Sequence, residues 1–262
     1  MEQLWNLILN NFVGCLLVFA RITGIFTFNP ILGRQNVPMR VRVMMSIALS
    51  ICVLAGMGGT TSFVPTSIPQ FALTLVGEIF LGLVFGFFVN LVMTSLLYAG
   101  EITDNKMGFM MANIMDPGSG IQAAVFANFY LYIFMLYFFV TQGHLQYIQL
   151  FVLSYDIIPI GFQVNFDTYN MVYKLILFFG TSLQIALKLA MPILATIMLL
   201  EICTGVVMKA VPGIQIFILT FSLKILLGLV MVFALTGVII TFIDRLFDTM
   251  WMGLEELLYM FI

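Results

Sequence analysis

The sequence predicts an all-α integral membrane protein with about six hydrophobic helical segments. Of its 262 residues, 62% are hydrophobic and 8% are charged, and the mean hydropathy is +1.13, whereas a soluble domain carries roughly 25% charged residues. The stretches between Arg42 and Glu78 and between Asp116 and Asp156 contain no charged side chain, and each can hold the roughly 20 residues that cross a bilayer as a helix. No alternation of polar and apolar residues runs through them, so helices are expected rather than a membrane barrel.

The apolar runs and the prolines set the expected segment boundaries. In chain order the segments cover residues 4–28, 43–59, 68–98, 121–143, 171–200 and 213–243. Most prolines lie at or near segment ends, where a missing N–H costs least, but Pro192 falls inside the fifth segment and predicts a kink. A shorter apolar stretch at 145–160 is expected to be interfacial or re-entrant. Some segments are therefore expected to be kinked or broken, within a single membrane domain that covers residues 1–262.

The C-terminal residues 244–262 are expected to form an amphipathic helix. Apolar side chains recur there at helical spacing, and acidic side chains fall between them. The acidic residues are Asp244, Asp248, Glu255 and Glu256. An acidic polar face argues against docking on anionic lipid, so the helix is expected to pack on a partner or on the chain's own bundle.

Residues 99–120 concentrate charge, glycine and methionine in a chain that is otherwise poor in charge. Four of the nineteen methionines, Met107, Met110, Met111 and Met115, lie here beside Phe109. Thioether side chains are flexible and polarizable, so they can seal around irregular shapes. The alternative is that methionine simply replaces leucine. Asp116-Pro117-Gly118 favours a turn that folds the segment back between two spans.

Charged side chains inside apolar segments need an explanation, because each costs roughly 2.5–3.5 kcal/mol at the centre of a membrane helix. The five candidates are Arg21, Glu78, Lys188, Glu201 and Lys224. One interpretation is a proton or ion relay. The other is that they pair within the bundle or with other subunits, or lie near segment ends and extend their charges to water. Glu78 and Lys224 lie deepest and are the better candidates for real contacts.

Catalytic, metal and nucleic-acid chemistry have no support in the sequence. His144 is the only histidine and has no cysteine or acidic residue near it at ligand spacing, and Cys15, Cys52 and Cys203 are isolated in apolar runs. No nucleophile–base arrangement or phosphate-binding glycine loop is present. The ten Lys and Arg residues are scattered rather than gathered into a basic stripe. The chain is therefore not expected to be an enzyme or to hold a cofactor.

Short motifs along nearly the whole chain resemble, in their order, the FliR family of flagellar export proteins and its injectisome relatives. They are Ala20-Arg21 with Asn29-Pro30-Ile31-Leu32 and Val37-Pro38-Met39-Arg40-Val41-Arg42; Ala99-Gly100-Glu101; Met107-Gly108 with Asp116-Pro117-Gly118-Ser119; Gly143-His144-Leu145 with Pro159-Ile160-Gly161; and Pro192-Ile193-Leu194 with Ala210-Val211-Pro212. Each motif is short, but the set is specific. One departure is Thr103-Asp104-Asn105-Lys106, where the family usually has apolar or amide residues before Met-Gly.

The resemblance implies a subunit of the flagellar type III export gate in the bacterial cytoplasmic (inner) membrane, at the flagellar basal body. Its helical hairpins would assemble with FliP-like and FliQ-like subunits, near an FlhB-like switch protein, into a closed channel for unfolded export substrates. The loop between the third and fourth segments would plug the pore. The plug residues carried over are Met107, Gly108, Phe109, Met110, Met111, Ile114, Met115, Asp116, Pro117 and Gly118.

Two other classes of function remain open. A secondary transporter could use Glu78, Lys188, Glu201 or Lys224 as a coupled ion site, although the sequence lacks the clear inverted repeat and the paired broken helices that many transporters have. A passive membrane scaffold would tolerate polar substitution of the methionines at 107–115.

Overall fold

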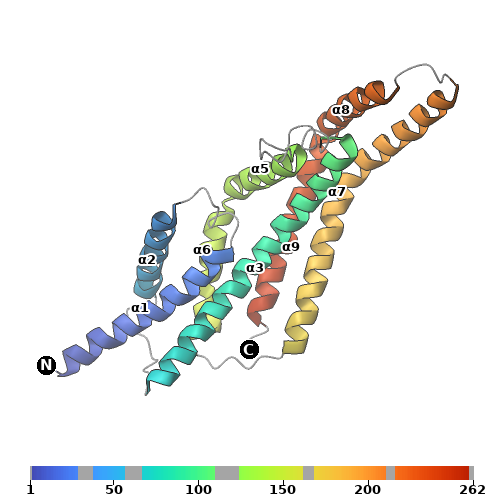
Figure 1. Ribbon diagram of the computed structural model, residues 1–262. Helices are drawn as coiled ribbons and strands as arrows, with labels where there is room; N and C mark the ends of the chain where they lie inside the picture. Colours follow the sequence, from blue (N-terminus) through green and yellow to red (C-terminus); the bar gives the residue numbers. More distant parts are fainter. Residues whose placement is uncertain are drawn as a thin grey trace. The chain divides into compact units, whose positions relative to one another are not determined.

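The computed structural model describes residues 2–28, 38–56, 67–109, 124–161, 168–210 and 216–259, and nearly all of these residues lie in α-helices (Figure 1). The helices are α1 (Glu2–Phe28), α2 (Met39–Gly56), α3 (Ile68–Met107), α5 (Val125–Val140), α6 (Gly143–Ile157), α7 (Thr168–Ala210), α8 (Ile216–Ala234) and α9 (Thr236–Tyr259). The predicted all-α class is confirmed.

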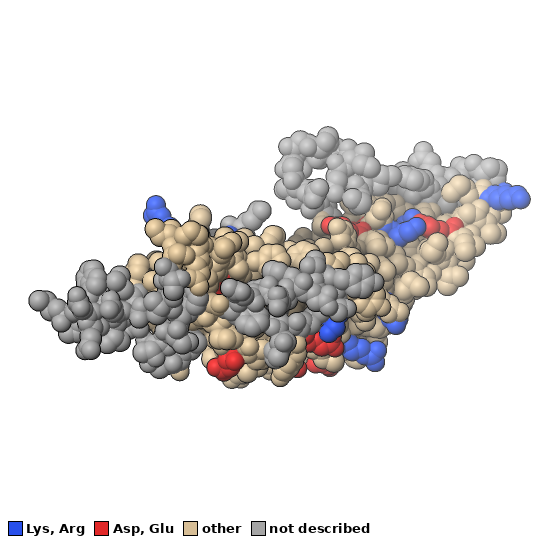
Figure 2. Space-filling view, turned by 90° about the horizontal axis from the view of Figure 1, so that it is seen from below, with Lys and Arg blue, Asp and Glu red and all other residues tan. Residues whose placement is uncertain are grey.

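Several helices have the length and composition of membrane spans. Among the described residues α2, α3 and α7 qualify alone, and the total rises to five if the bent pairs α5–α6 and α8–α9 each count as one span. The apolar part of α1, Phe12–Phe28, is shorter. In chain order α1, α2, α3, α5, α7 and α8 overlap the six predicted segments. Helix α7 does not end at 200 but continues to Ala210 as one helix that contains Pro192, and the separate stretch 145–160 is largely α6. On the face drawn in Figure 2, charged side chains form only small patches among uncharged residues.

The third segment is longer than predicted. Helix α3 does not end at residue 98 but continues to Met107, so residues 99–107 of the 99–120 stretch are helical. The polar side chains at Thr103, Asp104 and Lys106 do not end a helix by themselves. The helix ends where Gly108 takes a positive φ of 88°, a conformation that glycine adopts at little cost.

Two apolar runs contain sharp bends that the composition hides. Helices α5 and α6 meet at 70°, beside Gln142 in the left-handed region with φ 57°. The stretch 213–243 was expected to be one segment, but α8 and α9 meet at 67° at Leu235. The next residues are Thr236 and Gly237, and the Thr236 hydroxyl donates to the carbonyls of Val232 and Phe233. A hydroxyl bonded back to the preceding turn, followed by glycine, weakens helical continuity.

The chain forms two compact units. The first comprises Met1–Leu91, Gln142–Leu177 and Met250–Ile262, and the second comprises Val92–Thr141 and Phe178–Thr249. The first unit has a core of Leu17, Val18, Ile22 and Phe26 from α1, Val53 from α2, and Tyr155 and Ile160 from α6 and the turn after it. The single-domain assignment for residues 1–262 stays a prediction.

Helix α9 is amphipathic, as expected, but it begins at Thr236 rather than 244. Its apolar face is buried inside the chain: Ile239, Ile243, Leu246, Phe247, Met250, Leu254, Leu257 and Leu258 are at most 6% exposed. In the second unit the Phe247 ring packs on Phe134, Tyr137 and Phe138 of α5. The chain itself therefore covers this face, while Asp244, Asp248, Glu255 and Glu256 remain exposed.

Candidate functional site

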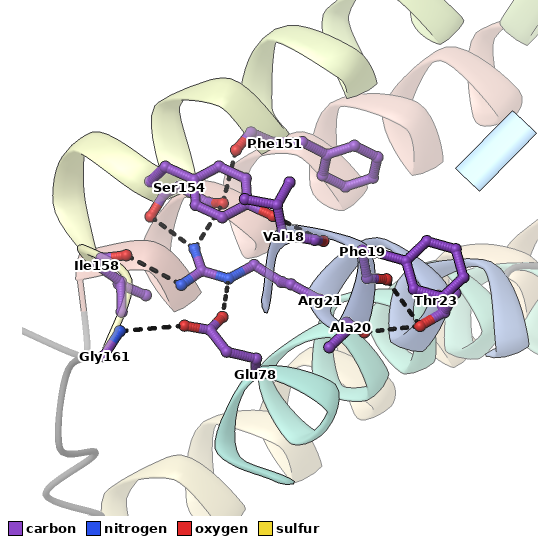
Figure 3. Close-up of polar contacts among 11 residues, drawn as sticks. Val18, Phe19, Ala20, Arg21, Thr23, Glu78, Phe151, Ser154, Ile158 and Gly161 are labelled. Atoms are coloured by element: carbon purple, nitrogen blue, oxygen red, sulfur yellow. Dashed lines mark hydrogen bonds and ion pairs between the residues drawn. The ribbon is translucent and has the colours of Figure 1, made fainter. Parts of the chain in front are cut away.

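A buried ion pair lies at the centre of the first unit (Figure 3). Arg21 of α1 is 0% exposed and Glu78 of α3 is 3% exposed, and Arg21 Nε lies 2.6 Å from Glu78 Oε2. Burying a charge is costly unless it is paired and its remaining hydrogen-bonding groups are satisfied. Here both conditions are met.

The rest of the Arg21 guanidinium binds the C-terminal end of α6. Its Nη1 donates to the carbonyl and hydroxyl oxygens of Ser154 at 3.1 and 3.2 Å, and its Nη2 donates to the carbonyl of Ile158 at 3.0 Å. Carbonyls at the C-terminal end of a helix carry partial negative charge, which a cation stabilises. The Ser154 carbonyl also accepts a hydrogen bond from the N–H of Ile158 at 2.9 Å. The guanidinium also lies over the ring of Tyr155, 4.1 Å from its centroid.

The second oxygen of Glu78 binds the turn after α6. Glu78 Oε1 accepts a hydrogen bond from the backbone N–H of Gly161 at 3.4 Å. Two side chains thus tie together α1, α3, the end of α6 and the turn that follows it. Because an arginine guanidinium does not release its proton in proteins, Arg21 suits a fixed structural contact better than a proton relay.

The second unit contains a more exposed ion pair. Lys224 Nζ of α8 lies 2.5 Å from Glu201 Oε1 of α7, with side chains 19% and 37% exposed. Glu78 and Lys224, the better candidates for real contacts, are each paired, and so are their partners Arg21 and Glu201. Lys188 of α7 is exposed. It belongs to neither of the two ion pairs found among the described residues. The described residues contain no group of three or more His, Cys, Asp or Glu side chains that could hold a metal ion.

Three of the predicted plug residues, Met107, Gly108 and Phe109, form the end of α3. The N–H of Phe109 donates to the carbonyl of Asp104 at 3.0 Å, and the N–H of Gly108 donates to the carbonyl of Asn105 at 3.2 Å. Together with the positive φ of Gly108, this is the Schellman arrangement that ends many helices. The remaining candidates, Met110, Met111, Ile114, Met115, Asp116, Pro117 and Gly118, lie outside the described residues.

Met107 anchors this helix end rather than facing an open space. Its side chain is 0% exposed and packs on Gly228 of α8, where a Cβ would lie 2.0 Å from Met107 Cε. Gly108 faces the Phe221 ring, and the Phe109 ring packs on Phe126 of α5 with centroids 5.8 Å apart. These residues are therefore the base of the methionine-rich segment, a role that the sequence did not distinguish from plugging.

Asp104 is a site residue that the sequence analysis did not identify as a contact. It is 2% exposed, and its carboxylate accepts hydrogen bonds from the N–H groups of Phe126 and Ala127 at 2.9–3.1 Å. These are the first-turn donors of α5. The sequence did contain one indication of this contact. Ala124, at the start of α5, cannot supply a side-chain cap, and alanine is among the poorest N-cap residues, so the first-turn N–H groups of α5 need an acceptor from elsewhere.

Comparison with known proteins gives a consistent result. The family described as "Bacterial export proteins, family 1" matches residues 12–250. The flagellar biosynthetic protein FliR of Bacillus subtilis is 25% identical over 93% of both chains, and that of Escherichia coli is 27% identical over 91% of this chain and 90% of its own. The surface presentation of antigens protein SpaR of Shigella sonnei is 23% identical over 85% of this chain and 84% of its own.

The match to the family covers almost the whole described fold, from the second half of α1 to the middle of α9. The resemblance read from the short motifs is thereby confirmed. Together with the helices that have the character of membrane spans, it identifies a membrane-embedded component of a flagellar or type III export apparatus. The chain belongs to the FliR family of bacterial export proteins.

Proposed function

We propose that this chain is a non-enzymatic subunit of the flagellar type III export gate in the cytoplasmic membrane. With FliP-like and FliQ-like partners, and near an FlhB-like switch protein, it forms a closed channel for unfolded export substrates. Family membership and the membrane helices support this role. The observation that carries the gating proposal is that Phe109 and Phe126, on either side of residues 110–123, are held by buried contacts within one unit.

The methionine-rich segment is the proposed plug. Its base is fixed by Met107, Gly108 and Asp104, so residues 110–120 are the part that provides the seal in this proposal. A deletion that begins at Met107 would also remove the helix end and a buried side chain. The informative variant therefore replaces residues 110–120 by a glycine-serine linker of equal length and keeps Met107–Phe109.

We expect the linker variant to assemble but to make the membrane permeable to small ions, because a glycine-serine chain cannot exclude water as apolar thioethers do. The measurement is ion conductance of the assembled complex in planar bilayers, with complex recovery as the assembly readout. Replacing Met110, Met111 and Met115 by leucine keeps the apolar volume and serves as the matched control. Unchanged conductance in a fully assembled linker variant contradicts the plug.

Lys188 is the one of the five intramembrane charges proposed to act between subunits. It lies in the middle of α7 on an exposed face with Gln184, Met191 and Ala195. A lysine on such a face is costly in lipid, so it would be stabilised by a partner carboxylate. We expect Lys188→Met to lower recovery of the assembled complex severalfold and Lys188→Arg to retain it.

The matched control for Lys188 is Lys209→Met, which removes an exposed lysine in the last turn of the same helix. Recovery is measured by affinity purification of the detergent-extracted complex. If the lysine faced lipid alone, methionine would be tolerated better than lysine, so equal or higher recovery of Lys188→Met contradicts the proposal.

A further inference from the structure

Helix α2 of the first unit turns its small polar side chains inward. Ser46 and Ser50 are 2% and 0% exposed, on one face with Val53, which belongs to the core built around α1. Their hydroxyls donate to carbonyls of the same helix, Ser46 to Arg42 and Ser50 to Ser46. Small residues are what bring membrane helices into close contact. The face of α2 that suits a neighbouring helix is therefore already packed on α1.

The outward face of α2 begins with a cation and continues with bulky apolar side chains. Its members recur at i, i+4, i+7 and i+11, which places them along one side of a helix: Arg40, Met44, Ile47 and Ile51. Arg40 is exposed, and the three apolar side chains are 70%, 45% and 56% exposed. Because helix–helix contacts in membranes favour small residues, this face suits lipid better than another helix.

The length of this face matches one leaflet of a bilayer. Ile51 follows Arg40 by eleven residues, which is about 16 Å of helix at a rise of 1.5 Å per residue. Half of a hydrocarbon core of roughly 30 Å is about 15 Å. The whole of α2 has 18 residues, or about 27 Å, close to the thickness of the full core. With Arg40 at the depth of the lipid phosphates, the apolar side chains lie at the depth of the acyl chains.

The first turn of α2 carries positive charge that it does not offset itself. It contains Arg40 and the half-buried Arg42 but no acidic residue. Arg40 belongs to neither of the two ion pairs found among the described residues. Cations are unfavourable beside the partial positive charge of a helix N-terminus, and an anion there is stabilising. Basic residues at a membrane surface attract anionic headgroups, whereas a zwitterionic headgroup brings a cation of its own.

We propose that the outward face of α2 binds an anionic phospholipid, whose phosphate contacts Arg40 and whose acyl chain lies along Met44, Ile47 and Ile51. A helix of a partner subunit would need an acidic residue opposite Arg40 and would meet bulky side chains instead of small ones, so lipid is the better fit. The bound lipid fixes the depth of α2 in the membrane. This inference is independent of the proposed plug and of Lys188.

The first experiment measures whether lipid reaches this face, with a fluorophore on Cys52, which is exposed and follows Ile51. Cys15 and Cys203 are replaced by alanine, and the complex that purifies with the full chain is placed in nanodiscs. A complex with Cys52→Ala gives the background. When the acyl chains of all the lipid carry bromine, we expect strong quenching of the label. An unquenched label means that a partner subunit covers the face, and it overturns the proposal.

The second experiment measures selectivity, in phosphatidylethanolamine nanodiscs that contain increasing fractions of brominated phosphatidylglycerol. We expect phosphatidylglycerol to be preferred at the label. Arg40→Gln should lower this preference about fivefold, which corresponds to the roughly 1 kcal/mol that one basic residue contributes near an anionic surface. Arg40→Lys keeps the charge and should retain most of the preference. Lys174→Gln is the control, because it removes an exposed lysine elsewhere in the first unit, and it should change nothing.

Three outcomes of the second experiment contradict the proposal. The first is a wild-type chain with no preference for phosphatidylglycerol. The second is an unchanged preference in Arg40→Gln, or an equal loss in Lys174→Gln, which would mean that general surface charge attracts the lipid. The third is release of the lipid by inorganic phosphate but not by chloride at the same ionic strength, which would show a site for free anions rather than for lipid.

Discussion

Replacing Arg21 by leucine is expected to destabilise the first unit by about 3–5 kcal/mol, because removing one partner leaves a buried, uncompensated charge. Glu78 is 3% exposed and cannot reach water from its place in the fold. The substitution also removes the guanidinium donors to the carbonyls of Ser154 and Ile158, although the Ser154 carbonyl keeps the hydrogen bond from the N–H of Ile158. The loss should appear in equilibrium unfolding followed by circular dichroism in mixed detergent micelles, and as less assembled complex in the membrane.

Exchanging the two charges, Arg21→Glu with Glu78→Arg, is not expected to rescue this loss. A glutamate at position 21 would place acceptors against the α6 carbonyls, which are acceptors themselves, and an arginine at position 78 would place donors against the N–H of Gly161. Recovery of wild-type stability by the exchange would show that the pair acts through charge alone. It would contradict the assigned role of the hydrogen bonds.

The matched control is the ion pair of the second unit. Lys224→Leu removes a contact of similar length, but Lys224 and Glu201 are 19% and 37% exposed. Water can therefore solvate the remaining carboxylate, and we expect a cost of about 0–1 kcal/mol. A cost as large as that of Arg21→Leu would mean that burial does not decide the difference between the two pairs.

The presence of paired charges followed from the sequence, but their partners did not. A charge in an apolar segment must be satisfied somewhere, and this argument correctly pointed to real contacts for Glu78 and Lys224. Arg21, however, is paired with a residue 57 positions away and bonded to carbonyls 133 and 137 positions away. Backbone carbonyls carry no residue type, so no motif in the sequence could identify them as partners.

The positions of the helices were predictable where hydrophobicity changes and were not where it stays constant. Residues 213–243 read as one segment because Leu235, Thr236 and Gly237 do not interrupt the apolar run, yet the helix bends there by 67°. At the end of α3 the error is the opposite. The polar residues after position 98 read as loop, but helix continuation is decided by the backbone, and Gly108 is the residue that ends it.

Substituting Gly82 by alanine is expected to be strongly damaging although it adds only one methyl group. Gly82 of α3 lies against α1 so closely that a Cβ would be 2.1 Å from the carbonyl oxygen of Arg21. Gly86, one turn later, meets the carbonyl of Ile25, and Gly24 of α1 meets the carbonyl of Ile79. Small residues four positions apart are a usual means of bringing membrane helices into close contact.

The obstacle at Gly82 is backbone, so no side-chain rotation can relieve it and the two helices must move apart. We expect Gly82→Ala to cost at least the roughly 1–3 kcal/mol of an overpacked core. Gly77→Ala, on the same helix, provides the control, because nothing lies within 4 Å of its Cβ position. There the higher helix propensity of alanine should stabilise the chain by up to about 1 kcal/mol. Both variants are measured by the same unfolding experiment in micelles.

The two predictions are coupled through Arg21, because the carbonyl that meets Gly82 belongs to the residue whose side chain binds Glu78. Moving α1 away from α3 lengthens that ion pair, whose atoms now lie 2.6 Å apart. Gly82→Ala should therefore remove part of what Arg21→Leu removes, and the double variant should be less unstable than the sum of the single losses. Strict additivity would show that the ion pair survives the separation of the helices, and that the close approach at Gly82 is not what brings Arg21 to Glu78.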